Sequence, residues 1–124
     1  MTISELAEST GVSKHTLRYY ERAGLVPLVG RHPSSGHRQY STQHSQWIAF
    51  VRNLRATGMP IRELRAYAKL VARGDETWPA RKAILAAHRS RVVAMITLLR
   101  KEQRILDQKL ALGCAPSSLR PGAA

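Results

Sequence analysis

The chain has 124 residues, a formal net charge of +12, a hydrophobic fraction of 44% and a charged fraction of 23%. This length leaves little room for an enzyme core with a deep cleft, the composition is globular rather than disordered, and no apolar run approaches the roughly 20 residues of a membrane span. The excess of positive charge indicates a polyanionic partner.

The first predicted element is a short helix over residues 3–10. Thr2 and Glu5 have the spacing of a capping box, in which the threonine hydroxyl accepts from the third helical amide and the carboxylate accepts from the amide of the cap residue. Gly11 follows and breaks the helix. A helix of about two turns is therefore expected before this glycine.

A second helix is predicted over residues 14–23. Ser13 offers its N-cap, and Gly24 suits the C-terminal cap because glycine adopts the left-handed conformation without strain. Two short helices about a glycine turn form a helix-turn-helix. The small core expected for this motif consists of Leu6, Ala7, Val12, Leu17 and Leu25.

The segment over residues 26–40 contains prolines, glycines and serines between two short extended pieces. This pattern predicts a β-hairpin, or wing, beside the helix-turn-helix. The combination of a cationic helix and a basic hairpin is typical of winged DNA-binding proteins.

Two more helices are predicted after the hairpin. The third begins at its N-cap Ser41 and runs to about Thr57, where Gly58 ends it. The fourth starts at Pro60, which suits a first helical turn, and stops near Gly74. Their apolar residues recur at helical spacing and are expected to be buried: Trp47, Ile48, Phe50, Val51 and Leu54 in the third helix, and Ile61, Leu64, Tyr67, Ala68 and Val71 in the fourth.

A much longer helix is predicted after a linker of residues 74–76. Thr77 and Pro79 begin a pattern that continues to about Leu112 without another glycine or proline, which corresponds to about 50 Å. Nothing else in the chain is large enough to cover its apolar stripe, so we expect a homodimer. The stripe has the seven-residue spacing of a coiled-coil seam and consists of Leu85, Val92, Leu99 and Leu106, with Met95, Ile96 and Leu110 beside them.

These elements predict a mainly α fold with a winged helix-turn-helix head followed by a long C-terminal coiled-coil helix. The expected parts are a DNA-binding domain over residues 1–74, a dimerisation helix over 75–112, and a flexible tail over 113–124 that is rich in proline, serine and glycine. Met1 leads into the first helix without the features of a secretory signal. We therefore expect a soluble, cytoplasmic protein.

Four residues of the second helix are predicted to contact DNA: Lys14, Thr16, Arg18 and Tyr19. A recognition helix presents side chains of its N-terminal turns to the major groove, while neighbouring cations hold phosphates. Arg18 is favoured because its planar fork fits a base edge or a phosphate, the alternative being a salt bridge with Glu21 or packing on an aromatic ring. Tyr19 and Tyr20 point in different directions, and we expect Tyr19 to face outward.

The wing and the third helix supply the other predicted DNA contacts, namely Arg31, His37, Arg38 and Tyr40 in the wing and Arg55 in the third helix. Cations and hydroxyls at these positions suit phosphates beside the major-groove contact. Tyr40 has an equal alternative as a core residue between the wing and the third helix. Arg52, like Arg55, either contacts the DNA backbone or lies on a solvated helix face.

Several of these motifs together resemble the MerR family of transcriptional regulators: Thr16-Leu17-Arg18-Tyr19-Tyr20-Glu21 with Gly24-Leu25, Gly36-x-Arg38-x-Tyr40, Leu54-Arg55-x-x-Gly58, and the long terminal helix. The resemblance implies a homodimer whose long helices cross as an antiparallel coiled coil on a near-palindromic promoter site with an over-long spacer. It also implies activation by bending and untwisting of that spacer, so that RNA polymerase engages both promoter elements. The family's glycine-tyrosine-arginine wing motif reads Gly36-His37-Arg38 here, and the imidazole of His37 can still donate to phosphate.

We expect no cofactor and no metal site. Metal-responsive relatives use paired thiolates near the end of the long helix, whereas this chain has the single Cys114 and five histidines without ligand spacing. Within the family the chain resembles the branch with aldehyde and thiol-stress sensors, but Asn53 stands where that branch has its third-helix cysteine. Cys114 is then either a thiol activated by Arg104 or Lys109, or a bystander.

A small-molecule effector stays open, since Tyr67 and Trp78 either line a pocket between the fourth helix and the long helix of the partner subunit or belong to the core. DNA binding without any such signal is the other alternative. Two other functions also stay open: an architectural or recombination accessory DNA-binding protein, which the long dimer helix disfavours, and an RNA-binding protein. An enzyme is not expected, because no nucleophile, base and orienting group can be assembled from these residues.

Overall fold

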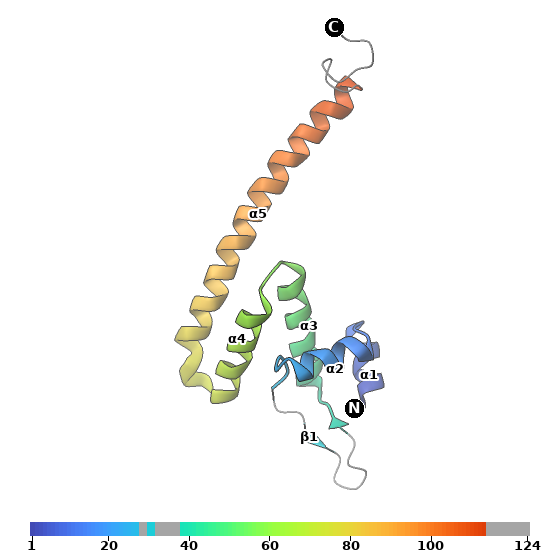
Figure 1. Ribbon diagram of the computed structural model, residues 1–124, viewed down its shortest axis with the longest axis vertical. Coiled ribbons are helices and arrows are strands. Elements are labelled where there is room, and N and C mark those ends of the chain that lie inside the picture. The colour runs from blue at the N-terminus through green and yellow to red at the C-terminus, as the bar shows by residue number, and fades with distance from the viewer. Residues whose placement is uncertain (28–29, 32–37, 114–124) are drawn as a thin grey trace. The chain divides into compact units, whose positions relative to one another are not determined.

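The computed structural model describes residues 1–27, 30–31 and 38–113, and this part of the chain is mainly helical (Figure 1). It divides into two compact units, the first over residues 1–87 and the second beginning at His88. In chain order the elements are α1 Ile3–Thr10, α2 Lys14–Arg22, β1 Gly30–Arg31, β2 Arg38–Gln39, α3 Thr42–Ala56, α4 Ile61–Arg73, the 3₁₀ helix η1 Asp75–Thr77, and α5 Trp78–Leu112.

The first helix begins and ends as the sequence predicts. The backbone N–H of Glu5 donates to the hydroxyl of Thr2 at 3.2 Å, and the backbone N–H of Thr2 donates to the Glu5 carboxylate at 3.3 Å. Gly11 ends the helix with a φ of 71°. The capping box and the glycine together explain why α1 has only two turns and leaves a tight connection to α2.

The end of α2 lies one residue earlier than predicted, at Arg22, and its exit is a Schellman motif. The N–H of Gly24 donates to the carbonyl of Glu21 at 3.1 Å, and the N–H of Leu25 donates to the carbonyl of Tyr20 at 2.9 Å. Gly24 has a φ of 75°, where a side chain would be strained. The glycine therefore sits one position beyond the cap residue and turns the chain toward the hairpin.

The core of the first unit contains all but one of the residues predicted for the helix-turn-helix. Leu6, Val12, Leu17 and Leu25 are buried, and Ala7 is partly buried at the edge. Met59 in the α3–α4 turn is fully buried, although it belongs to none of the periodic apolar patterns that predicted the helices. The core therefore extends from the helix-turn-helix into the turn between α3 and α4.

Trp47 and Phe50, which were predicted to be buried, pack against the core but are only partly buried. The two rings form an aromatic group with the buried Tyr67 of α4, in which Trp47 stacks on Tyr67 with centroids 5.9 Å apart. Phe50 meets Tyr67 edge-on at 5.8 Å. Large rings at the α3–α4 contact thus cover one side of the core while leaving part of their own surface in solvent.

The predicted linker over residues 74–76 is an ordered turn. The hydroxyl of Thr77 donates to the carbonyl of Leu70 at 2.8 Å and to that of Gly74 at 2.7 Å, and Thr77 is buried. Pro60 is the N-cap of α4 rather than part of its first turn. The first turns of α5 return along the core, where Ile84 and Leu85 pack as partly buried residues.

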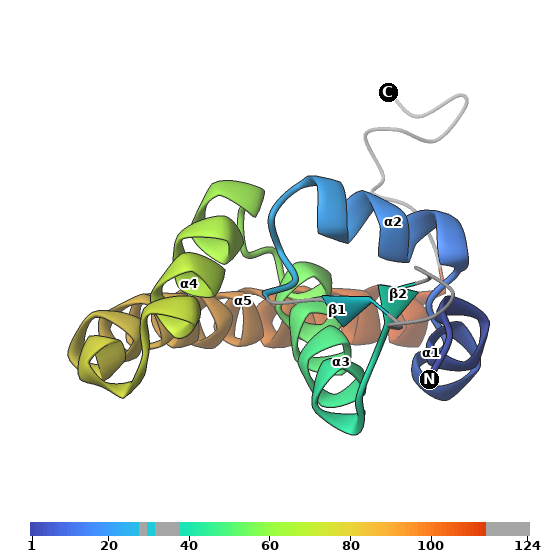
Figure 2. The same ribbon diagram turned by 90° about the horizontal axis from the view of Figure 1, so that it is seen from below.

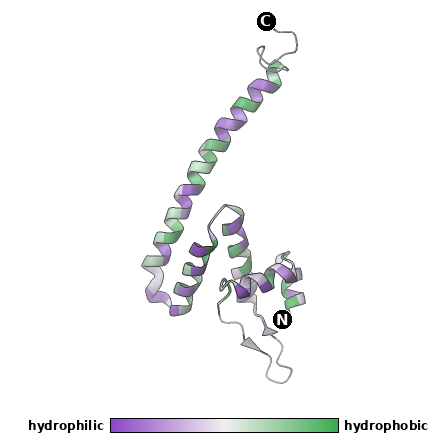
Figure 3. Cartoon of the chain, viewed as in Figure 1, coloured by the Kyte–Doolittle hydropathy of each residue, from purple (hydrophilic) through white to green (hydrophobic). Residues whose placement is uncertain are grey.

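In the described part of the second unit, the chain continues as the remainder of α5, which ends at Leu112 as predicted. Hydrophobic and hydrophilic residues alternate along it (Figure 3), and large apolar side chains are exposed, among them Leu99 at 64% and Leu106 at 59%. None of the helices in the described part of the chain combines the length and the hydrophobicity that crossing a membrane requires.

Candidate nucleic-acid interface

The two faces of α2 differ sharply in burial and charge. Leu17 and Tyr20, one helical turn apart, are buried in the core. Lys14, Arg18 and Tyr19 are exposed, and Thr16 is half-buried. The expected orientation of the tyrosine pair is confirmed, since Tyr19 is 42% exposed and Tyr20 only 7%. The helix therefore presents cations and a phenol to solvent from residues 14–19.

Arg18 has no hydrogen bond or ion pair within the part of the chain that the structure describes. The alternative of a salt bridge with Glu21 is thus not observed, and Glu21 instead accepts a hydrogen bond from the hydroxyl of Tyr40. The guanidinium of Arg18 keeps all of its donors available for a base edge or a phosphate.

Thr16 takes part in the N-cap of α2. Its backbone N–H donates to the hydroxyl of Ser13 at 3.1 Å, and the Ser13 hydroxyl donates to that of Thr16 at 3.0 Å. Because a hydroxyl both donates and accepts, the proton of the Thr16 hydroxyl remains free to donate. The cap thus fixes the first turn of the helix and leaves one hydroxyl donor on it.

The predicted wing is present as a two-stranded antiparallel ladder that pairs Gly30 with Gln39 and Arg31 with Arg38. This register puts the two predicted wing arginines at facing positions of the ladder. His37, the third wing residue predicted to contact DNA, lies outside the described residues.

Tyr40 follows the wing and is 5% exposed, which favours its reading as a core residue. Its backbone N–H donates to the carbonyl of Met1 at 2.9 Å, and its hydroxyl donates to Glu21 of α2. The side chain therefore connects the base of the wing to the recognition helix rather than to solvent.

Arg55 was predicted to contact DNA, with a solvated face as its alternative, and the structure shows a third arrangement. Its Nη1 donates to the carbonyl of Met59 at 2.9 Å in the α3–α4 turn. Arg52 Nη1 donates to the carbonyl of Thr10, the last residue of α1, at 2.7 Å. Both arginines are exposed, and each is held by a hydrogen bond to a main-chain carbonyl. They therefore stabilise the fold of the DNA-binding head and also contribute positive charge to its surface.

Sequence reasoning missed a third arginine of this kind. Arg65 on α4 donates from Nε to the carbonyl of Ala23, the C-cap of α2, at 2.8 Å. Trp47 Nε1 donates to the carbonyl of Leu25 at 2.6 Å. The signal available in the sequence was only general: helix ends leave carbonyls that need donors.

The predicted seam residues fall into two groups. Leu85 is partly buried against the core of its own first unit. Val92 is partly exposed, and the remaining members are exposed: Met95 at 39%, Ile96 at 42%, Leu99 at 64%, Leu106 at 59% and Leu110 at 79%. The exposed part of the predicted seam thus begins beyond Leu85.

No group of three histidine, cysteine, aspartate or glutamate side chains that could hold a metal ion is found among the described residues, which do not include Cys114. The two aromatic residues proposed for an effector pocket differ in their surroundings. Tyr67 is buried beneath Trp47, whereas Trp78 is 47% exposed with the guanidinium carbon of Arg81 5.4 Å from the centre of its ring.

Two family models match the chain. The model described as MerR HTH family regulatory protein covers residues 1–70, and the model described as MerR, DNA binding covers residues 46–111. Among curated relatives, the HTH-type transcriptional regulator AdhR of Bacillus subtilis is 43% identical over 93 residues. That match spans 75% of this chain and 66% of AdhR, just under two thirds of the relative.

Two solved structures share the architecture over most of their length. A chain from Listeria monocytogenes described as a MerR family transcriptional regulator has a TM-score of 0.84 and 35% identity, over 89% of this chain and 83% of that one. HiNmlR, described as a MerR family regulator lacking the sensor domain and bound to promoter DNA, has a TM-score of 0.82 and 32% identity, over 89% and 86%. The predicted mainly α fold, with a DNA-binding head and a long C-terminal helix, is confirmed.

Proposed function

The chain belongs to the MerR family of helix-turn-helix regulatory proteins and is a DNA-binding transcriptional regulator, and from this premise we propose that it acts as a homodimer on a near-palindromic promoter site. Two copies of α2 enter successive major grooves of one duplex. The spacer between the promoter elements is bent and untwisted so that RNA polymerase engages both. The protein works in the cytoplasm and carries out no catalytic step.

The observation that carries this proposal is the exposed face of α2. Lys14, Arg18 and Tyr19 are exposed on a helix whose other face is fixed in the core by Leu17 and Tyr20. Reading a major groove requires donors on the N-terminal turns of a rigid helix, and this arrangement supplies them. The facing arginines of the wing, Arg31 and Arg38, add phosphate contacts beside the groove.

The exposed apolar residues of α5 support the homodimer. Leu99, Leu106 and Leu110 are each more than half exposed in the single chain. A stripe of this kind at seven-residue spacing is covered when an identical helix packs against it about a two-fold axis. Such a dimer sets two heads on one duplex, and its phosphate contacts supply the roughly 1 to 6 kcal/mol that smooth bending of the site costs.

The direct test is selection from a random duplex library with the full chain, followed by footprinting and by sedimentation of the complex. We expect an inverted repeat, protection of both halves, and a complex with two chains. Bending is then measured by energy transfer between dyes at the duplex ends. Equal affinity for folded RNA and random duplex would reject the proposal, and a single half-site bound by one chain would point instead to an architectural or recombination accessory protein.

A further inference from the structure

We propose that Arg65 is a positioning residue for DNA reading, which holds the recognition helix α2 at the register that its base contacts require. This inference rests on the proposed function, because it concerns how α2 is held while it reads DNA. Its basis is the hydrogen bond from Arg65 Nε to the carbonyl of Ala23 at 2.8 Å. Arg65 comes from α4, and Ala23 is the C-cap of α2.

This hydrogen bond joins α2 and α4, two helices that otherwise pack little against each other. The main packing partner of α2 is α1, and α4 packs on α3 and η1. In Figure 2 the end of α2 that leads into the hairpin is the end nearer to α4. The Arg65 side chain reaches this end, and its Cγ lies 3.7 Å from the position that a Cβ on Gly24 would occupy. Its stem therefore rests against the glycine while its guanidinium caps the helix.

Two carbonyls just beyond α2 are held from two different helices. Trp47 of α3 donates to the carbonyl of Leu25 at 2.6 Å, while Arg65 of α4 donates to that of Ala23. A helix of nine residues that is fixed on one side can still rotate or slide about that contact. The second bond, from another direction, removes this freedom, and a shift of about an ångström matters for contacts that must meet a base edge.

The type of residue fits the task. The carbonyls at a helix C-terminus lack helical partners and carry the negative end of the helix dipole, so a cationic donor is favoured there. Only Nε of Arg65 is engaged within the described residues, and the side chain is exposed. The planar guanidinium therefore fixes the direction of the hydrogen bond to the Ala23 carbonyl. A lysine ammonium on a flexible stem does not reproduce this direction.

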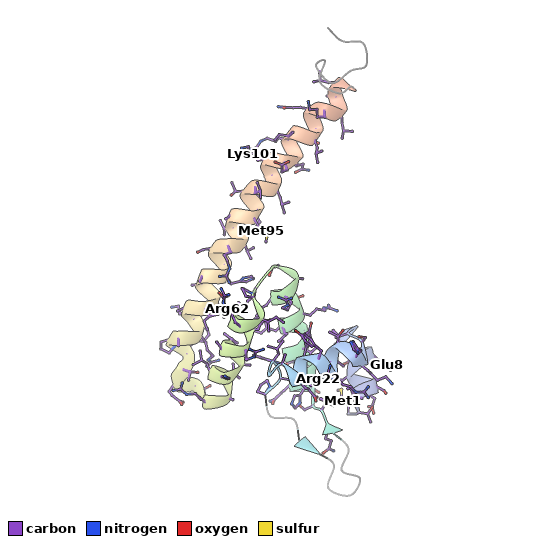
Figure 4. The ribbon with its side chains drawn as sticks, viewed as in Figure 1. Met1, Glu8, Arg22, Arg62, Met95 and Lys101 are labelled. Atoms are coloured by element: carbon purple, nitrogen blue, oxygen red, sulfur yellow. The ribbon has the colours of Figure 1, made fainter. Side chains whose placement is uncertain are left out.

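The test compares Arg65→Ala and Arg65→Lys with Arg62→Ala. Arg62, labelled in Figure 4, is an exposed arginine one turn earlier on α4 and has no hydrogen bond or ion pair within the described part of the chain. Each full-length variant is titrated with the selected duplex and with a random duplex at several salt concentrations. All titrations are made well below the thermal midpoint of the least stable variant, so that partial unfolding does not enter the comparison.

We expect Arg65→Ala to lower the ratio of the two affinities by about fivefold or more, because the base contacts are lost and the phosphate contacts are kept. Arg62→Ala should weaken both duplexes equally and leave the ratio unchanged. Arg65→Lys, which keeps the positive charge but not the planar guanidinium, should show a similarly reduced ratio. If Arg65→Ala leaves the ratio unchanged, or if Arg62→Ala lowers it as much, the positioning role is overturned. If the unaltered chain itself shows no preference for the selected duplex, the proposed function fails instead.

Discussion

The hydroxyl of Tyr40 donates a hydrogen bond to Oε1 of Glu21, and so joins the residue after β2 to the last turn of α2. We expect Tyr40→Phe to lower the free energy of unfolding by about 1 kcal/mol, since it removes a partly buried bond to a charged acceptor and keeps the ring in the core. The measurement is a urea titration followed by circular dichroism at 222 nm, a far-ultraviolet wavelength that reports helix content.

The matched variant is Tyr19→Phe, which removes the same hydroxyl from a ring that is 42% exposed on the same motif. Its stability should stay within about 0.5 kcal/mol of the unaltered chain, as is usual for surface substitutions. Its affinity for the selected duplex should fall. If Tyr40→Phe instead loses affinity for DNA and keeps its stability, Tyr40 contacts DNA, which was its other predicted role.

Arg52 and Arg55 form a second matched pair, since both donate to main-chain carbonyls from α3. Replacing either one by alanine should lower the free energy of unfolding by about 1 kcal/mol. Only Arg55→Ala should also weaken binding, and it should do so equally for selected and random duplex. The slope of log affinity against log salt concentration should fall by about one, because one phosphate contact is lost. Identical salt slopes for the two variants would leave Arg55 a purely structural residue.

Arg18 is the residue for which we predict the largest effect on sequence reading. Arg18→Ala should cost about 1 to 3 kcal/mol of binding free energy on the selected duplex and clearly less on random duplex, because a bidentate base contact is lost. Arg22→Ala is the control: Arg22 is exposed on the last turn of the same helix (Figure 4). Arg22→Ala should lower the affinity for both duplexes equally. If Arg18→Ala also lowers both affinities equally, Arg18 contacts phosphate and not a base.

The features that were predictable from the sequence are those fixed by neighbouring residues. The caps at Thr2 and Ser13, the turn at Gly24 and the end of α5 at Leu112 each depend on a few adjacent positions. Local hydrogen bonds and the left-handed conformation of glycine decide them, so the sequence pattern is sufficient. The outward face of α2 was also predictable, because the spacing of apolar residues along a helix determines which of its faces is buried.

The anchors that hold the head together were not predictable, because they join distant residues. Arg52 and Thr10 are 42 positions apart, as are Arg65 and Ala23. A sequence shows that a helix end needs donors, but the donor depends on how whole helices pack. The same holds for Leu85, whose spacing fits the coiled-coil seam while its surroundings are the core of the first unit.

The homodimer gives the last prediction, which concerns the part of α5 beyond Leu85. Leu99 is 64% exposed in the single chain and lies in the middle of the predicted seam. In Leu99→Glu the dimer would have to bury two like charges without partners, which costs several kcal/mol, so we expect dissociation into single chains by analytical ultracentrifugation.

Lys101→Glu is the control for charge, because a residue two positions along a helix lies about 200° around it and so on the far side from Leu99. Lys101 is exposed, and its replacement should leave the dimer intact. Single chains in Leu99→Glu should still bind random duplex through one head, but they should lose the gain in affinity that two linked heads have on an inverted repeat. A dimer of unchanged mass in Leu99→Glu would mean that the two chains meet along a different surface, such as the one that contains Leu98, Ile105 and Leu112, which are also exposed.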